Sequence, residues 1–143
     1  GPRDDFDPQD SHVIPALIRK IDAARDAGTD HIVAWGDGSA TREFLFVEDA
    51  AEAIFLATQH YNGEAPVNIG NGVEISIKRL YTTLCELMKY SGEVRWDTTK
   101  TNGQPWRQLD VSLAQQQFGF EAKVGLEAGL RRTIDYYYEA VKS

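Results

Sequence analysis

Helix-like and strand-like patterns alternate along the chain, and this alternation constrains the fold more than any other feature. Apolar residues recur at helical spacing from His12 onward and again within residues 50–61, 76–88, 111–118 and 126–141. Short runs rich in β-branched and aromatic residues separate these segments. The order is helix, strand, strand, helix, strand, helix, strand, helix, helix. Such an order is typical of a small α/β domain, and 143 residues match the length of one domain with a buried core.

Capping and turn residues suggest where the elements begin and end. Ser11 is expected to cap a first helix that ends at Gly28, and Ser76 is expected to cap the helix that runs to Met88. The strands are expected at residues 31–35, 43–47, 66–70 and 93–96. The irregular segments at residues 1–10, 36–42 and 97–107 are where functional residues are expected.

Composition excludes several classes of protein. The net charge of −7 argues against a protein that binds nucleic acid through its phosphate backbone, although a few basic side chains could still hold a small anionic ligand. One cysteine cannot form an internal disulfide or a cysteine-rich zinc site. Neither a transmembrane segment nor a signal peptide is evident. A soluble, cytoplasmic domain without a metal or a membrane partner is therefore expected.

Two motifs that suggest nucleotide chemistry have simpler explanations. Gly36-Asp37-Gly38 and Gly70-Asn71-Gly72 follow apolar runs, but neither continues as G-x-G-x-x-G into a helix or supplies a P-loop lysine. Both are interpreted as turns, and no cofactor-binding residue is assigned. Tyr138 and Lys142 have the Tyr-x-x-x-Lys spacing of short-chain reductases, but their place near the end of the chain favours coincidence.

Five residues have side chains suited to an anionic, aromatic ligand. His12 and Lys20 fall near one side of one helix, and His12 could act as an acid or base because its ordinary pKa lies near neutrality. Trp35 offers a flat face for a base, whereas Arg42 and Arg107 offer positive charge for phosphates. Taken one at a time, each is more often a structural or solvated residue. Periodicity alone does not show that they converge.

A family resemblance connects these residues. Residues 35–50, WGDGSATREFLFVEDA, resemble the W-G-x-G-x-x-x-R-E-F-x-x-V-x-D-x-A signature of extended short-chain dehydrogenases/reductases that act on nucleotide sugars. Residues 68–72 resemble the N-x-G-x-G segment of the same enzymes. Two further stretches are similar to GDP-L-fucose synthase-like enzymes: residues 1–20, and residues 100–110, whose counterpart there is the loop K-P-[DN]-G-x-P-R-[KR]-x-L-D. The resemblance implies the small substrate-binding domain of an extended reductase, with short strands and about five helices but without the Rossmann half.

The resemblance also implies a chemistry and a set of site residues. Such enzymes epimerise and reduce GDP-4-keto-6-deoxy-mannose to GDP-L-fucose with NADP as cofactor. By position in the motifs, His12 corresponds to the acid of the epimerisation. The residues that correspond to contacts with the GDP-sugar are Val13, Leu17, Lys20, Trp35, Arg42, Asn102 and Arg107. Asn102 and Trp106 depart from the pattern, because some members have Asp at the first position and most have Arg at the second.

The parts of such an enzyme that carry out hydride transfer have no counterpart here. Its glycine-rich cofactor loop, its Tyr/Lys pair and its cysteine base are all expected upstream of a segment like this one, so the isolated chain is expected to be inactive. We expect residues 1–143 to form a single GDP-sugar-binding domain whose partner is the missing Rossmann half or a second copy. Two alternatives remain: part of a UDP-, dTDP- or other GDP-sugar epimerase or dehydratase, and a stand-alone binding or assembly module.

Overall fold

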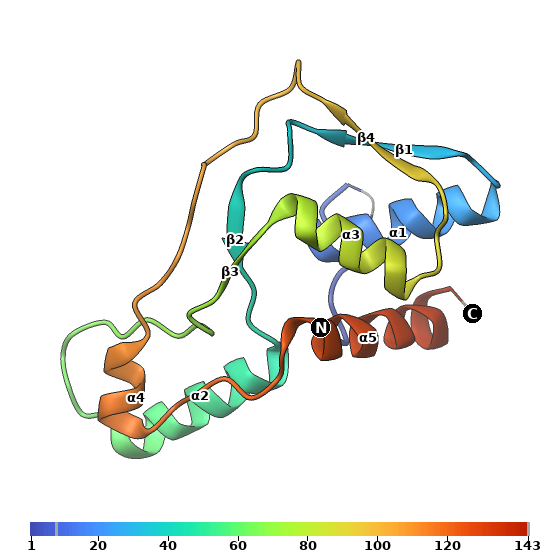
Figure 1. Cartoon of the computed structure of the whole chain (residues 1–143). Coiled ribbons are helices and arrows are strands. Elements are labelled where there is room, and N and C mark those ends of the chain that lie inside the picture. Colours follow the sequence, from blue (N-terminus) through green and yellow to red (C-terminus); the bar gives the residue numbers. More distant parts are fainter. Residues whose placement is uncertain (8, 143) are drawn as a thin grey trace.

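The computed structural model describes residues 1–7 and 9–142; Pro8, within the expected loop at residues 1–10, and Ser143 lie outside the described residues. Figure 1 shows the arrangement of the chain. Its helices are α1 (Val13–Asp26), α2 (Val47–His60), α3 (Ile77–Leu87), α4 (Ser112–Phe118), α5 (Leu126–Tyr136) and a π-helical turn, η1 (Tyr137–Val141). Its strands are β1 (His31–Trp35), β2 (Thr41–Glu43), β3 (Glu74–Ser76) and β4 (Glu93–Asp97). This mixed α/β architecture with five α-helices and short strands confirms the expected fold class.

The strands form two small sheets. β1 and β4 pair in parallel, with His31 opposite Glu93 and Trp35 opposite Asp97. β2 and β3 pair antiparallel, with Thr41 opposite Ser76 and Glu43 opposite Glu74. Because β1 leads into β2 through a tight turn at residues 36–40, the carboxyl ends of β1 and β4 lie near the start of the second sheet.

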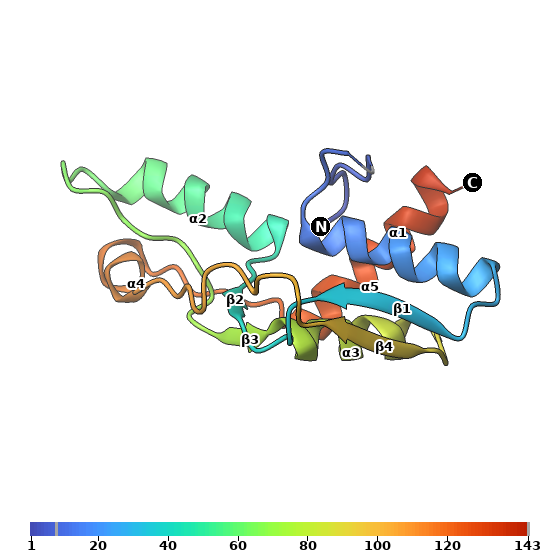
Figure 2. The same cartoon turned by 90° about the horizontal axis from the view of Figure 1, so that it is seen from above.

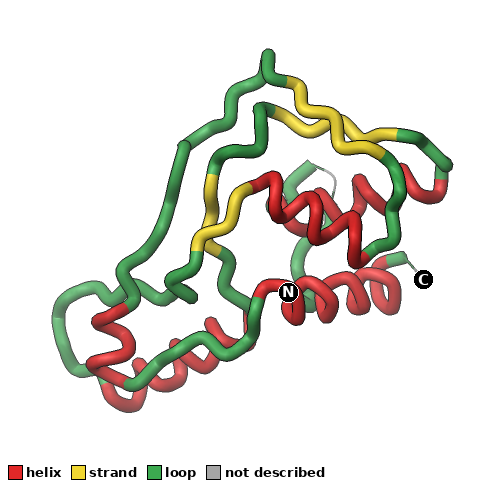
Figure 3. The backbone as a smooth tube through the Cα atoms, in the orientation of Figure 1, coloured by secondary structure: helices red, strands yellow, loops and turns green. Residues whose placement is uncertain are grey.

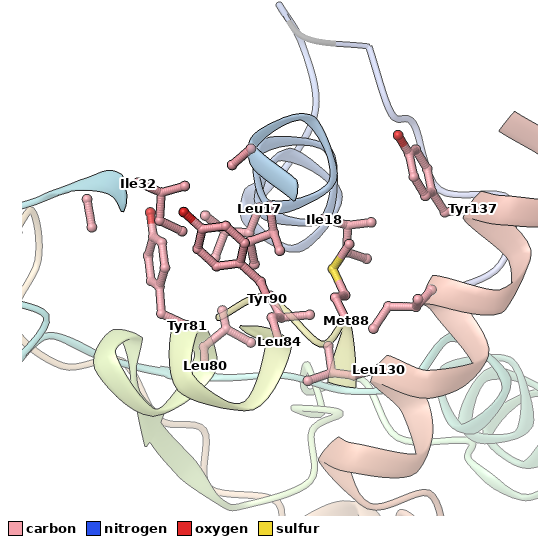
Figure 4. Close-up of a cluster of buried hydrophobic side chains, with 14 of the residues drawn as sticks. Leu17, Ile18, Ile32, Leu80, Tyr81, Leu84, Met88, Tyr90, Leu130 and Tyr137 are labelled. Carbon is pink, nitrogen blue, oxygen red and sulfur yellow. The ribbon is translucent and has the colours of Figure 1, made fainter. Parts of the chain in front are cut away.

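The main core lies between three helices and the parallel pair. Ile18 and Ile21 of α1, Leu80 and Leu84 of α3, and Leu130 of α5 are all at most 2% exposed. Figure 4 shows α1 side chains facing those of α3, with Leu130 approaching from α5. Burying large aliphatic side chains contributes about 1.5–3 kcal/mol each relative to exposure, so this cluster fixes α1 against the sheet.

A second, smaller core joins α2 to α4. Ala53, Ala114, Phe118 and Phe120 are buried there. In Figures 1 and 2 this pair of helices lies at the opposite end of the molecule from β1 and β4. The connection between the two ends consists of the β2–β3 sheet and the long loops, which Figure 3 draws in green.

The order of elements expected from the sequence is correct, but two strands are misplaced. The apolar run at residues 43–47 is not a strand: β2 ends at Glu43, and α2 already begins at Val47. Residues 66–70 are also not a strand, whereas β3, a few residues later, had not been expected. Both errors arise because a strand needs a hydrogen-bonding partner, which local apolar content does not specify.

The helix caps agree with the sequence at one position and differ at another. The Ser76 side chain accepts a hydrogen bond from the Arg79 amide at 3.1 Å, as expected for a cap of α3. At α1 the cap position is His12 and no side-chain cap bond forms, so the expected role of Ser11 is wrong. The Ser11 hydroxyl is instead a buried oxygen without a hydrogen-bond partner among the described residues.

Candidate functional site

A pocket of about 670 Å³ opens where α1, β1, β2 and α3 meet the loop that follows β4. Its walls combine apolar surface with charged groups. The lining residues include Val13 and Lys20 of α1, Trp35 at the end of β1, Arg42 and Glu43 of β2, and Tyr81 of α3. Thr101, Asn102, Arg107 and Leu109 of the loop complete one side. A volume of this size suits a small-molecule ligand.

The pocket concentrates positive charge in an acidic chain. Lys20, Arg42 and Arg107 all line it, and Glu43 is the acidic residue among them. The Lys20 ammonium group donates a hydrogen bond to the Val33 carbonyl of β1. Although the side chain as a whole is exposed, desolvation of this end lowers the pKa of Lys20. The three basic groups give the pocket the local charge that an anionic ligand needs.

Gly36 allows the turn after β1 to approach the loop closely. Its φ of +76° lies in the left-handed region, and a Cβ here would stand 1.9 Å from Asn102 Oδ1. Asn102 Oδ1 accepts a hydrogen bond from the Asp37 amide at 2.8 Å. The turn therefore holds Asn102, and with it one wall of the pocket, beside Trp35.

Residues 101–110, which we call the strap, lie alongside β2 in Figures 1 and 2. Every residue of the strap is exposed, so hydrogen bonds rather than burial hold it. The Thr41 amide donates to the Pro105 carbonyl at 2.9 Å. Arg42 Nη1 donates to the carbonyls of Thr41 at 2.6 Å and Gln104 at 2.7 Å. Arg42 thus supplies charge to the pocket and at the same time anchors the strap.

Glu43 and Glu74 complete this attachment, and the sequence had not singled out either residue. Glu43 accepts backbone hydrogen bonds from Asn71 and Gly72 through Oε1 and from Leu109 through Oε2. Glu74 Oε1 accepts bonds from the Thr41 hydroxyl and the Arg107 amide. The signal that could have found Glu43 is its place in the R-E-F motif, directly after Arg42.

Six of the eight site residues expected from the family resemblance line one pocket. They are Val13, Lys20, Trp35, Arg42, Asn102 and Arg107. Trp35 is 70% exposed, so its indole face is open to a ligand rather than buried in the core. Leu17 is instead 6% exposed within the main core. His12 is exposed at the amino-terminal end of α1 and is absent from the pocket lining. The role of each of the eight residues in binding or catalysis stays a prediction.

Tyr138 and Lys142, whose spacing had suggested a reductase motif, are part of a different cluster. Tyr138 Oη donates to the buried Asp22 carboxylate at 2.9 Å, and Lys142 Nζ lies 2.7 Å from it. Tyr137 Oη and Arg25 also donate to Asp22. Burial raises the pKa of Asp22, but the hydrogen bonds from Lys142, Tyr138 and Tyr137 outweigh it and leave the pKa lowered. We call this cluster the latch, because it joins η1 to α1.

Within residues 1–7 and 9–142, no group of three or more His, Cys, Asp or Glu side chains is arranged to hold a metal ion. Of the helices in the described part of the chain, none has both the length and the apolar content needed to cross a membrane.

Comparison with known proteins gives this geometry a context. Residues 1–70 match the model of the NAD dependent epimerase/dehydratase family. A probable GDP-L-fucose synthase 1 from Oryza sativa subsp. japonica is 41% identical over the whole chain, which covers 43% of that protein. A GDP-L-fucose synthetase from Naegleria fowleri bound to NADP superposes with a TM-score of 0.90 at 26% identity, with the chain covering 45% of it. UDP-glucose 4-epimerase of Thermotoga maritima with UDP-glucose gives 0.84 at 27% identity, with 99% of this chain and 43% of that chain covered.

The fold and the sequence are therefore similar to those of NAD-dependent epimerases and dehydratases. More narrowly, the chain is similar to the carboxy-terminal part of GDP-L-fucose synthases, which confirms the resemblance noted in the sequence. The chain spans less than half the length of the curated relatives that it matches.

Proposed function

We propose that residues 1–143 form one domain that binds the GDP-sugar substrate in a longer, NADP-dependent enzyme of the GDP-L-fucose synthase type. The observation that carries the proposal is the convergence of Lys20, Arg42 and Arg107 with Trp35 and Asn102 around one pocket. These residues come from α1, β1, β2 and the strap, so their meeting was not evident from sequence spacing.

The side chains match the parts of a nucleoside diphosphate sugar. Arginine guanidinium groups bind phosphate oxygens in bidentate geometry, which suits Arg42 and Arg107 to the diphosphate. The exposed indole of Trp35 suits the base, because aromatic faces stack on flat rings. The amide of Asn102 and the apolar wall at Val13 and Tyr81 can orient the sugar or the base.

NADP and the reductive step belong, in this proposal, to the remainder of the longer protein. The relative from Naegleria fowleri is described as bound to NADP, and the present chain spans less than half of it. NADP would supply the hydride that reduces a keto sugar. His12 would act as the acid of the epimerisation, placed at the amino-terminal end of α1 just before Val13 of the pocket.

Titration of the chain with GDP, UDP and dTDP by isothermal calorimetry tests this proposal. We expect GDP to bind most tightly, with affinity that falls as salt is added because the contacts are charged. Arg131→Ala is a control variant that should bind GDP as wild type does, because Arg131 pairs with Glu127 on α5 and does not line the pocket. Absence of GDP binding at millimolar concentration would contradict the proposal.

A different nucleotide specificity is the second candidate. The structural similarity to UDP-glucose 4-epimerase favours it, because that protein shares the fold at comparable sequence identity. The same titration separates the two, since tighter binding of UDP or dTDP than of GDP would assign the pocket to another sugar nucleotide.

We also propose that the outer face of α2 packs against the rest of the longer protein. Ile54 and Phe55 are each 60% exposed, and Val47 is 46% exposed on the same side of the helix. Exposed apolar stripes of this kind mark surfaces that a partner covers. The relatives are more than twice as long as this chain, and in this proposal part of their additional length covers the stripe.

Light scattering after size-exclusion chromatography tests this second proposal. We expect the isolated chain to self-associate through the uncovered stripe, and Phe55→Asp to return it to a monomer. Ala23→Asp on the exposed side of α1 is a matched control that should leave self-association unchanged. A monomeric wild-type chain at high concentration would count against the stripe as an interface.

A further inference from the structure

We propose that Glu43 is a positioning residue that holds the strap, one wall of the pocket, against the turn at residues 71–72, which directly follows the pocket residues Ile69 and Gly70. The proposal rests on the proposed function only for the ligand, a nucleoside diphosphate. Its structural basis is independent of that ligand.

Both oxygens of the Glu43 carboxylate are in use, and they serve different segments. Oε1 accepts the amide of Asn71 at 2.6 Å and that of Gly72 at 2.9 Å. Oε2 accepts the amide of Leu109 at 3.0 Å. A Cβ at position 70 would stand 2.0 Å from Oε1, so Gly70 is what permits this approach. One side chain therefore joins segments that are far apart in the sequence.

The strap depends on such bonds because its own side chains are not buried. All ten of its residues are exposed, so little apolar packing opposes its movement. Segments with few buried apolar contacts open at low free-energy cost. Leu109 lines the pocket and lies at the point where Glu43 holds the backbone, so releasing that amide displaces a pocket wall.

Glu74, directly opposite Glu43 in the β2–β3 register, provides an internal comparison. Glu74 accepts both of its bonds through Oε1 alone. A glutamine has one acceptor oxygen and one NH₂ group that can only donate. Glu74→Gln can therefore keep both bonds through its single oxygen. In Glu43→Gln, by contrast, the NH₂ group must face at least one of the backbone amides, which then has no acceptor.

Amide hydrogen exchange, measured residue by residue with NMR, tests the structural part. In Glu43→Gln we expect the Leu109 amide to exchange faster than in wild type, while Asn71 and Gly72 stay protected. In Glu74→Gln we expect the Arg107 amide to keep its protection. If all three amides held by Glu43 keep wild-type protection in Glu43→Gln, the proposal is wrong.

Calorimetric titration with GDP tests the effect on the pocket. We expect Glu43→Gln to bind GDP about threefold to tenfold more weakly than Glu74→Gln, although each variant loses one negative charge. Glu93→Gln, at an exposed position of β4, is the variant expected to bind like wild type. Equal affinities of Glu43→Gln and Glu74→Gln, below their unfolding temperatures, would overturn the positioning role.

The two experiments separate this inference from the proposed function. If wild type fails to bind GDP but the Leu109 amide is released in Glu43→Gln, the ligand assignment is wrong and Glu43 still holds the strap. If wild type binds GDP and Glu43→Gln binds it equally well, the ligand assignment stands and the positioning role is overturned.

Discussion

Asp22 and Glu43 each collect several hydrogen bonds, but in opposite surroundings. Asp22 is 3% exposed, and its partners are side chains: the hydroxyls of Tyr137 and Tyr138 and the cations of Arg25 and Lys142. Glu43 is only partly buried, and its partners are backbone amides of loops. The first carboxylate joins two helices of the core, whereas the second sets the shape of a pocket.

Because their surroundings differ, we expect the latch and the strap to respond differently to mutation. Loss of a buried carboxylate leaves cations and hydroxyls unpaired, which lowers the free energy of unfolding. Loss of an acceptor at an exposed loop lets water replace it, which changes geometry more than stability. Three further changes test this contrast, in order of decreasing effect.

The largest effect is expected for Asp22→Asn. Removing the charge from the latch should lower the free energy of unfolding by about 3 kcal/mol, because a buried ion pair loses one partner. Asp26→Asn is the matched control: Asp26 also pairs with Lys142, but its side chain is 55% exposed, so the loss should be at most about 1 kcal/mol. Urea denaturation measures both. Equal losses would remove the distinction between the latch and an ordinary surface ion pair.

A smaller effect is expected for Arg42→Ala. The variant loses the bond to the Gln104 carbonyl and the guanidinium group that we propose to bind phosphate, so GDP affinity should fall about 10- to 100-fold. The free energy of unfolding should change by less than in Asp22→Asn, since the strap adds little buried surface. Calorimetry and urea denaturation of the same samples give both values. A large loss of stability with unchanged affinity would reverse the roles assigned to the two regions.

The smallest effect on stability is expected when the pH is lowered. The pKa of Asp22 in the folded chain lies below its ordinary value of 3.8, so the latch stabilises the fold above that value. This contribution is lost as the pH falls through the lowered pKa, because the proton then binds the folded state as well. We expect the stability difference between wild type and Asp22→Asn to shrink below pH 3.8 and to stay constant from pH 5 to about 7. A difference that does not depend on pH would show that the charge of Asp22 is not what stabilises the latch.

The sequence predicted the fold best where one helix face decides the structure. α1, α3 and α5 were expected close to where they lie, because their apolar stripes are long and regular. The strand predicted from Glu43 to Val47 was wrong because the residues of this run pack in different places. Phe44 and Leu45 line the pocket, whereas Phe46 packs over Gly129, where a Cβ would come within 2.9 Å of its ring. A uniform apolar run can therefore change from strand to helix within five residues.

The residues of the candidate site could be predicted together only through their resemblance to family motifs. Lys20, Trp35, Arg42 and Arg107 could be chosen by residue type, but no spacing rule brings four separate segments together. Glu43 was missed because its partners are the main-chain amides of Asn71, Gly72 and Leu109. Every residue except proline has such an amide, so the sequence does not indicate which ones a carboxylate will bind. Leu17 lies in the core, on the face of α1 that packs inward with Ile18 and Ile21, and its expected contact with the ligand stays a prediction.

The π-helical turn η1 sets the rotational phase at the end of the last helix. In a regular α-helix, five residues advance the direction of a side chain by roughly 500°, so residues 137 and 142 would point about 140° apart. The wider turn closes after five residues, with the Lys142 amide donating to the Tyr137 carbonyl at 2.9 Å. Tyr137 and Lys142 therefore reach the same carboxylate. In a regular α-helix only residues about four apart return to within about 40° of one direction, so η1 accommodates one residue more than an α-helical turn while keeping Lys142 on the side of Tyr137 and Asp22.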